Sequence, residues 1–328
     1  MKDSIHWGII GTGAIAHKFA QGLALLNDAK LMAVASRRQE TADAFGQQHR
    51  IPRCYGSYAE LAQDPDIHVV YVATPHPFHK ENTLLCLEAN KAVLCEKPFA
   101  LNAQEARAMV QAARERGLFL MEAMWTRFLP LMVKIREMLE QGSLGAIQML
   151  AADFGAHFPF DPAHRAYNPD LGGGALLDLG VYVVSLASMV FGGPPEQMTS
   201  LVTLAETGVD EQEGMVFRYP DGQIAILSAS MRVTTPQEAT IVGTHGRVRI
   251  HRPWWAASRF TLATETQETD MIIPFAGNGY NYEAREVMAC LRAGKTESDV
   301  MPLDETLSIM ETMDQLRAQW GLRYPQER

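Results

Sequence analysis

The chain has 328 residues, of which 47% are hydrophobic and 20% are charged, and its formal net charge is −9. This length suffices for two domains with full cores, and the negative charge argues against nucleic acid or an anionic membrane as a partner. We expect no membrane span, because no apolar run in the sequence reaches spanning length. We also expect no signal peptide, because the first residues lack its basic start, long apolar middle and cleavage site. The four cysteines are scattered without a C-x-x-C pair, which predicts no metal site and a reducing, cytoplasmic location.

The first third of the chain alternates short apolar strands with helices. Helices are expected after the first strand as far as about residue 26, over about 78–89, and from residues 57 and 102 onward. The expected strands cover residues 5–10, 30–35, 67–73, 92–95 and 118–121. Such alternation predicts a parallel sheet that is covered on both faces and binds its ligand at the carboxyl ends of the strands.

The first strand is followed by the motif GTGAIA at residues 11–16. Gly11 permits a tight turn, Gly13 lets the backbone approach a pyrophosphate, and Ala16 replaces the third glycine at the helix–sheet contact. The N–H groups at the start of the helix, at Ala14 and Ile15, favour phosphate binding. The motif therefore predicts a dinucleotide site, and the alternative is a plain strand–helix turn.

The second strand ends in Ser36-Arg37-Arg38. NAD-specific sites usually carry an acidic residue here, which would repel a 2′-phosphate. Ser36 is neutral, and arginines can pair with a phosphate and stack on adenine. We therefore expect NADP rather than NAD; the alternative is a solvated basic helix start, where arginines are common.

Two loops follow strands of the predicted sheet at its carboxyl edge, where a nicotinamide would lie. One carries Thr74 and His76, and the other reads Glu96-Lys97-Pro98. A lysine held there could donate to a substrate hydroxyl and favour its alkoxide, which makes hydride departure easier. The alternative is an ordinary lysine at a strand end.

Residues 175–191 are apolar nearly all round, so this predicted helix should be buried. Asp178 is its only charge, and Tyr182 lies four residues further on, on the same face. A buried carboxylate needs a partner, and Lys97 is a candidate. The alternatives are a helix cap for Asp178 and a core aromatic for Tyr182.

The rest of the second part predicts one large, mostly antiparallel open sheet, whose outer face a partner subunit could cover. Asp221-Gly222 marks a hairpin, and helices are expected at about 282–293 and 303–320. Trp125, Phe154, Trp254 and Trp255 could wall a substrate pocket, although core packing explains any one of them. The expected strands cover residues 146–154, 198–205, 214–219, 223–231, 240–242 and 247–250.

Four stretches together resemble the glucose–fructose oxidoreductase/inositol dehydrogenase (Gfo/Idh/MocA) superfamily, and within it the branch of dimeric dihydrodiol and NADP-dependent D-xylose dehydrogenases. These stretches are GIIGTGAIA, ATPHPFHKENTLLCLEANKAVLCEKPFALN, GLFLMEAMWTRF and GGGALLDLGVYVVSLASMVFGG. The resemblance implies an NADP-binding Rossmann domain over residues 1–122 and an α+β domain over 123–328 that binds substrate and forms a homodimer through its sheet. It also implies that Lys97, His79, Asp178 and Tyr182 are the catalytic candidates.

We therefore expect hydride transfer between a cyclic sugar or diol hydroxyl and NADP. Tyr182 would take the hydroxyl proton, with its pKa lowered by Lys97 from a phenol's usual value near 10. Two alternatives remain: a dehydrogenase for inositol or another sugar derivative, and a non-catalytic NADP-sensing regulator. The intact set of Lys97, Asp178 and Tyr182 argues against the regulator.

Overall fold

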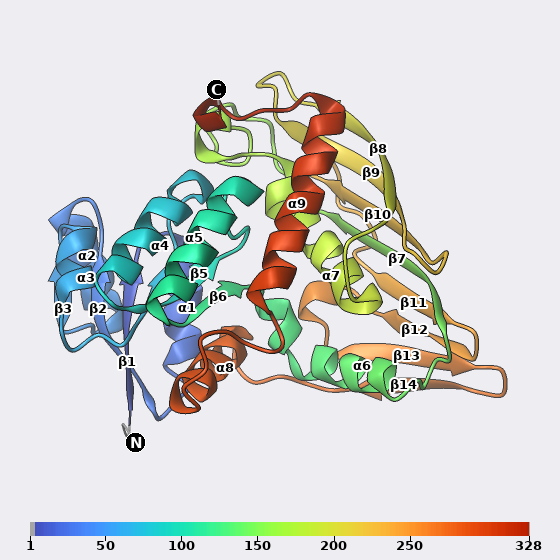
Figure 1. The fold of residues 1–328 in the computed structure, drawn as a ribbon, viewed down its shortest axis with the longest axis horizontal. Helices are drawn as coiled ribbons and strands as arrows, with labels where there is room; N and C mark the ends of the chain where they lie inside the picture. The colour runs from blue at the N-terminus through green and yellow to red at the C-terminus, as the bar shows by residue number, and fades with distance from the viewer. Residues whose placement is uncertain (1–3, 328) are drawn as a thin grey trace. The chain divides into compact units, whose positions relative to one another are not determined.

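The computed structural model describes residues 4–327, which form two compact units. One unit comprises Met1–Phe128 with Ala276–Leu307, and the other comprises Leu129–Phe275 with Ser308–Arg328. A six-stranded parallel sheet lies in the first and an eight-stranded, mostly antiparallel sheet in the second (Figure 1). These two sheets confirm the fold class that the sequence predicts. The assignment of NADP binding to residues 1–122, and of substrate binding and dimer contacts to residues 123–328, stays a prediction.

The sheet of the first unit has the strand order β3-β2-β1-β4-β5-β6, with every pair parallel. Every residue of β4 and β5 is buried, because helices cover the sheet on both faces. The strands are β1 (Ile5–Ile10), β2 (Ala29–Ala35), β3 (Arg53–Tyr55), β4 (Val69–Val72), β5 (Ala92–Glu96) and β6 (Leu120–Ala123).

The helices of the first unit include one from a distant part of the sequence. α8 packs against α1, and α4 packs against α5. Phe19 of α1 stacks on Tyr71 of β4 with ring centroids 3.8 Å apart, and Trp7 of β1 lies against the same ring of Phe19. The helices are α1 (Ala14–Leu23), α2 (Gln39–His49), α3 (Tyr58–Gln63), α4 (His79–Glu88), α5 (Ala103–Arg116) and α8 (Tyr280–Arg292).

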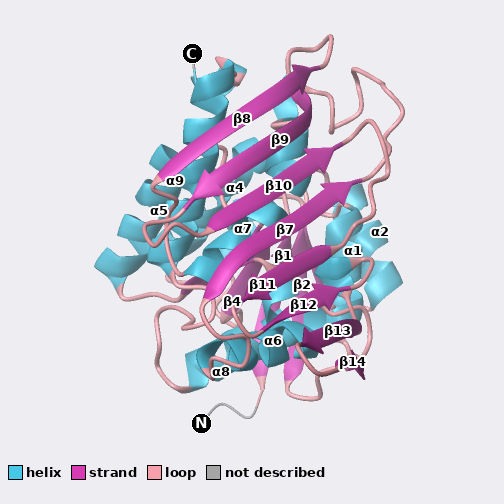
Figure 2. Ribbon diagram, turned by 90° about the vertical axis from the view of Figure 1, so that its right-hand side faces the viewer, coloured by secondary structure: helices cyan, strands magenta, loops and turns pink. Residues whose placement is uncertain are grey.

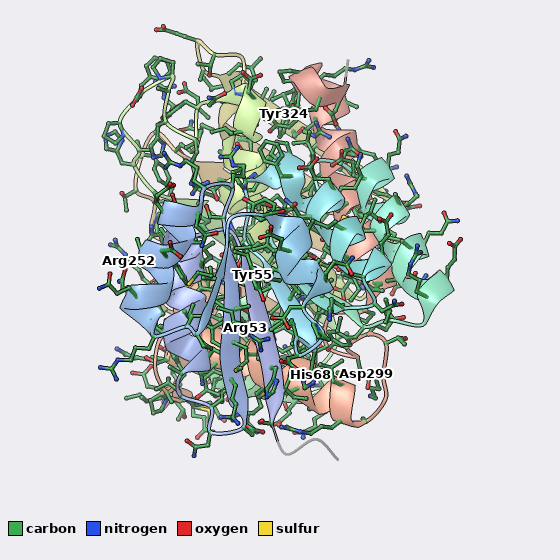
Figure 3. The ribbon with its side chains drawn as sticks, turned by 90° about the vertical axis from the view of Figure 1, so that its left-hand side faces the viewer. Arg53, Tyr55, His68, Arg252, Asp299 and Tyr324 are labelled. Atoms are coloured by element: carbon green, nitrogen blue, oxygen red, sulfur yellow. The ribbon has the colours of Figure 1, made fainter. Side chains whose placement is uncertain are left out.

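Strand β3, at the edge of this sheet, is absent from the strands expected from the sequence. It has three residues, so no periodic pattern announces it. Tertiary contacts define it instead: Arg53 and Tyr55, labelled in Figure 3, both bond to the carboxylate of Asp64, at 2.9 and 3.0 Å. Helix α2 was missed as well, because its residues are mostly polar.

The sheet of the second unit has the order β14-β13-β12-β11-β7-β10-β9-β8 (Figure 2). Only the pair β7–β10 is parallel among the described pairs of this sheet. Asp221 and Gly222 form the turn between β9 and β10, with Gly222 at φ 83°, as the sequence predicts. The strands are β7 (Ile147–Gly155), β8 (Gln197–Leu204), β9 (Asp210–Arg218), β10 (Ile224–Ser230), β11 (Ala239–Gly243), β12 (Gly246–Ile250), β13 (Arg259–Thr264) and β14 (Glu268–Ile272).

One face of this sheet packs on helices. Helix α7 (Val181–Phe191) contacts β7 and β10, and is preceded by the π-helical turn η4 (Leu176–Gly180). α6 (Pro130–Glu140) belongs to this unit, and α9 (Leu303–Trp320) ends in it. Over the described residues, no helix lies on the other face of β8, β9 and β10 (Figure 2).

Three expectations need correction. The sequence Ser57-Tyr-Ala-Glu60 is typical of a capping box, and Ser57 does precede α3 as its N-cap residue, but its side chain makes no capping hydrogen bond. The helix expected over 175–191 begins with a π-helical turn, so its hydrogen bonds span five residues there rather than four. Contrary to the expectation that no run reaches spanning length, the stretch Pro169–Phe191 is long and apolar enough to cross a membrane; 83% of its apolar window is buried inside the protein, which is typical of a core helix.

Candidate active site

The glycine motif forms the turn between β1 and α1. Gly11 has φ 100°, and a Cβ on it would lie 2.6 Å from the carbonyl oxygen of Ala73, so only glycine fits. A Cβ on Gly13 would meet no atom within 4 Å, and no side chain caps the start of α1. Ala16 is fully buried. The backbone at Ala14 and Ile15 thus leaves room and N–H groups for an anion, which fits the pyrophosphate of a dinucleotide.

The end of β2 presents a neutral side chain and two cations. Ser36 is buried, whereas Arg37 and Arg38 are exposed at the start of α2. Burial is the main cause of the raised pKa of nearby Tyr58, and the charge of Arg37 acts in the opposite direction. This edge carries no acidic residue at the three positions that follow β2.

His79 ties the two loops of the predicted nicotinamide site together. Its ring is fully buried; Nε2 lies 2.7 Å from the carbonyl oxygen of Thr74 and Nδ1 lies 2.9 Å from that of Pro98. A neutral imidazole has one N–H, so it donates to one of these carbonyls at a time. Burial lowers the pKa of His79. His76 also belongs to the first loop, and its ring meets that of His79 edge-on at 5.8 Å.

The loop after β5 rests on a buried acid. Glu96 accepts a short hydrogen bond from the hydroxyl of Tyr71 and another, at 3.1 Å, from the backbone N–H of Lys97. The Lys97–Pro98 peptide bond is cis, and the Lys97 side chain is half-buried. Glu96 therefore orients the backbone that carries Lys97.

Glu283 of α8 is a second buried acid near Glu96, and the sequence analysis missed it. It is fully buried, and neither carboxyl oxygen has a hydrogen-bond partner among the described residues. Burial and then the charge of Glu96 raise its pKa well above the usual range. Burial and the neighbouring charge of Glu96 therefore both favour the neutral form of Glu283. No local pattern marks it, because it reaches this sheet from a helix far along the chain.

In the second unit, Asp178 lies on the π-helical turn η4 and is nearly buried. Its carboxylate forms an ion pair with Arg165, at 2.9 Å between Oδ2 and Nη2. The sequence analysis also missed Arg165, which follows the β7 strand in a loop without helical or strand periodicity. Irregular π-helical turns occur frequently at functional sites.

Tyr182 belongs to an aromatic cluster of this unit. Its ring lies 5.3 Å from Phe154 of β7, and Phe154 stacks on Trp255 at 3.4 Å between centroids. Trp254 instead is buried and donates its indole N–H to the carbonyl of Asp153 at 2.8 Å. The two tryptophans therefore have different surroundings. Trp255 belongs to the aromatic cluster that contains Tyr182, whereas Trp254 is hydrogen-bonded to the backbone of β7.

The sequence-predicted residues therefore fall into two groups. Lys97, His79 and the nucleotide-binding candidates lie in the first unit, as does Trp125, which stacks on Tyr280 at 4.7 Å. Asp178, Tyr182, Phe154 and Trp255 lie in the second. Between residues 4 and 327, no three histidine, cysteine or acidic side chains gather in a way that could hold a metal ion.

Comparison with known proteins finds two family models that match successive parts of the chain. Residues 5–124 match the family described as "Oxidoreductase family, NAD-binding Rossmann fold", and residues 132–249 match the GFO/IDH/MocA C-terminal domain. Trans-1,2-dihydrobenzene-1,2-diol dehydrogenase of Mus musculus is 41% identical over 338 residues, and that of Homo sapiens 40% over 334; each alignment covers 99% of both chains.

A solved structure supports the fold at full length. The 3-ketoreductase KijD10 from Actinomadura kijaniata, in complex with NADP and TDP-benzene, is 25% identical with a TM-score of 0.85, and the match covers 96% of this chain and 97% of that one. Since both family models and full-length relatives agree, the chain belongs to the Gfo/Idh/MocA oxidoreductase family and is an NAD(P)-dependent dehydrogenase of a small molecule.

Proposed function

We propose that this protein is an NADP-dependent dehydrogenase of trans-dihydrodiols or cyclic sugars, D-xylose among them. The observation that carries the proposal is the likeness, over 99% of both chains, to trans-1,2-dihydrobenzene-1,2-diol dehydrogenases. The stacked rings of Phe154 and Trp255 beside Tyr182 support a flat, ring-shaped substrate, because such rings pack against aromatic walls.

NADP is the proposed cofactor. Ser36 lacks the carboxylate that would repel a 2′-phosphate, and Arg37 and Arg38 are exposed beside it. The amino end of α1, at Gly13, would hold the pyrophosphate. A cofactor held by these residues would supply the acceptor for the hydride of the substrate carbon.

The chain's own residues handle the proton and the orientation of the substrate. We assign to Tyr182 the role of base that accepts the proton of the substrate hydroxyl. The Lys97 ammonium would stabilise the negative charge that develops on the substrate oxygen. Asp178, paired with Arg165, would accept a hydrogen bond from a second substrate hydroxyl. His79 would act indirectly, because its ring is hydrogen-bonded to the carbonyl of Pro98 and so holds the loop that carries Lys97.

A homodimer in the cytoplasm is the proposed working form, with residues 1–122 binding NADP and residues 123–328 binding substrate and the partner. The outer face of β8, β9 and β10 supports this, because Leu201, Val216 and Ile226 are 84%, 40% and 46% exposed there. Such an apolar sheet face favours a second copy of the chain as its cover.

The test is absorbance at 340 nm when the protein is mixed with NADP⁺ or NAD⁺ and each of trans-benzene dihydrodiol, D-xylose and myo-inositol. The proposal expects turnover with the diol or D-xylose, and a kcat/KM for NADP⁺ above that for NAD⁺. Turnover of inositol alone would contradict the substrate assignment. A protein that binds NADP⁺ without turning over any of the panel would instead be a sensor.

A further inference from the structure

Two buried acids from β9 lie beneath the π-helical turn η4. Asp210 is fully buried and Glu213 is 2% exposed. β9 and its neighbour β10 both contact η4 within the second unit. Neither acid is part of the site described above. Buried carboxyls are costly unless they are bonded, so their contacts show what they hold.

Asp210 binds the amino end of the helical segment. Its Oδ2 accepts the backbone N–H of Leu176 at 2.5 Å, and Gly174 leaves no room for a Cβ because Oδ1 of Asp210 occupies that space. The first N–H groups of a helix lack partners within the helix, and a carboxylate there also meets the favourable end of the helix dipole. Asp210 thus caps, from a neighbouring strand, the segment that carries Asp178.

Glu213 lies under the other end of the same turn. A Cβ on Gly180 would lie 3.1 Å from Oε1 of Glu213, so the turn touches this carboxyl where η4 ends. Neither oxygen of Glu213 has a hydrogen-bond partner among the described residues. The π-helical turn is therefore in contact with β9 at both of its ends, through Asp210 and Glu213.

The titratable groups around Asp210 come from three parts of the chain. Glu213 lies on its own strand and Arg317 on α9; the Tyr324 ring, labelled in Figure 3, precedes η6 (Pro325–Glu327) and packs under Arg317. Burial raises the pKa of Asp210 to about 6, while the N–H of Leu176 and the charge of Arg317 act in the opposite direction. Burial, and then Asp210, raise the pKa of Glu213 well above its usual range.

The remaining nearby groups are already engaged. The hydroxyl of Tyr324 donates to the carbonyl of Gly173 at 2.7 Å, and Glu327 pairs with Arg317 at 2.8 Å. Burial, and then the charge of Asp210, raise the pKa of Tyr324 far above its ordinary value, so it stays a neutral donor. Asp178 itself faces Arg165. With its pKa raised to about 6, Asp210 changes charge just below neutral pH.

We propose that Asp210 is a positioning residue: as a carboxylate it holds the N–H of Leu176 and so fixes the π-helical turn that presents Asp178 to the substrate. This rests on the proposed function, in which Asp178 binds a substrate hydroxyl. A wide π turn is rarely stable by itself, so the carboxylate selects it. When Asp210 takes up a proton the hold weakens and Asp178 loses its fixed position.

The first arm of the test uses turnover. Asp210→Asn should lower kcat for the best diol or sugar by 10- to 100-fold, because small displacements of an orienting group cost that much. The Kd for NADP⁺ should stay unchanged, since its proposed site is in the other unit. The wild-type protein should lose kcat below about pH 6, and the variant should lack this acid limb. Glu122→Gln, which alters a buried acid of the first unit, should keep both the kcat and the limb.

The second arm needs no substrate. Hydrogen exchange of the segment 174–180, corrected for intrinsic rates, should show a protected Leu176 amide above pH 6.5, with protection falling about tenfold by pH 5 or in Asp210→Asn. The proposal would be overturned if Asp210→Asn kept the kcat of the wild-type protein and the same loss of kcat below pH 6. Protection of the Leu176 amide that did not change with pH would overturn it as well. If no substrate is turned over, the proposed function fails and exchange alone decides whether Asp210 fixes the turn. If the variant does not fold, the wild-type exchange profile decides.

Discussion

The guanidinium of Arg165 lies 2.9 Å from the carboxylate of Asp178, and this pair joins an irregular loop to a π-helical turn. A carboxylate on an otherwise apolar helical segment needs such a partner, because burial disfavours its charged form. The pairing shows that Asp178 has a charged neighbour inside its own unit. Lys97 is therefore not required as that neighbour, although the sequence suggested it.

Arg165→Gln tests the pair. Without the guanidinium, Asp178 should lose its fixed orientation, and kcat/KM for the diol or sugar should fall about tenfold, a modest loss because the arginine side chain is 53% exposed. Steady-state kinetics measure it. The matched control is Arg259→Gln: Arg259 is 51% exposed and pairs with Asp270 on the edge strands. Equal kinetics for the two variants would show that Arg165 does not serve the site.

Lys97→Met should reduce kcat by a factor of 10² to 10⁴ while the Kd for NADP⁺ changes little, because the ammonium acts mainly on charge that develops during the reaction. Rapid-mixing absorbance at 340 nm and cofactor fluorescence titration measure the two quantities. Lys80→Met is the control, since Lys80 is 39% exposed and pairs with Glu105. A Lys97→Met variant with full turnover contradicts the assignment.

Ser36→Asp should reverse the cofactor preference. The new carboxylate would repel a 2′-phosphate and accept from a ribose hydroxyl, so kcat/KM for NADP⁺ should fall by at least tenfold while that for NAD⁺ is kept or rises. Arg37→Gln should weaken NADP⁺ alone, and Arg116→Gln on α5 should change neither cofactor. If Ser36→Asp left the NADP⁺ to NAD⁺ ratio unchanged, the phosphate would be bound elsewhere.

The burial of Glu122 should make the protein's free energy of unfolding depend on pH. It is fully buried, one carboxyl oxygen has no partner among the described residues, and burial raises its pKa to about 7. Since the folded state binds this proton more tightly, stability falls as pH rises from about 4.5 to 7, by roughly 3 kcal/mol. Glu122→Gln should therefore raise Tm at pH 8 and much less at pH 5, measured by calorimetry. An equal change at both pH values would refute the assignment.

Ile226→Asp tests the sheet face. Ile226 is opposite Val216 on the outer face of β10 and β9, so a charge there should break a dimer that buries this face. Sedimentation velocity should then show a monomer that keeps its secondary structure. Leu25→Asp in the first unit is the control, because Leu25 is 53% exposed in the turn after α1. A wild-type monomer, or a dimer that survives Ile226→Asp, contradicts the proposed interface.

Several features could be predicted because they depend on neighbours in the sequence. The positive φ of Gly11 is a local backbone conformation that favours glycine, and the cap of α5 at Asn102 is a contact with Glu105 only three residues away. The hairpin at Gly222 is similarly local. Where the pattern was short or polar, as in β3 and α2, no local signal distinguished the element from a loop.

The sequence by itself determined the fold class, the nucleotide-binding turn and the buried character of the segment with Asp178 and Tyr182, since all of these follow from short-range periodicity and steric preference. Only the tertiary structure decided the partners: Arg165 for Asp178, Glu283 near Glu96, and Asp210 for Leu176. It also separated Trp255 from Trp254. The partners lie on different segments of the chain, 13 residues apart for Arg165 and Asp178 and 34 for Leu176 and Asp210, so no local periodicity marks them. Burial of charge selects them only after folding has brought those segments together.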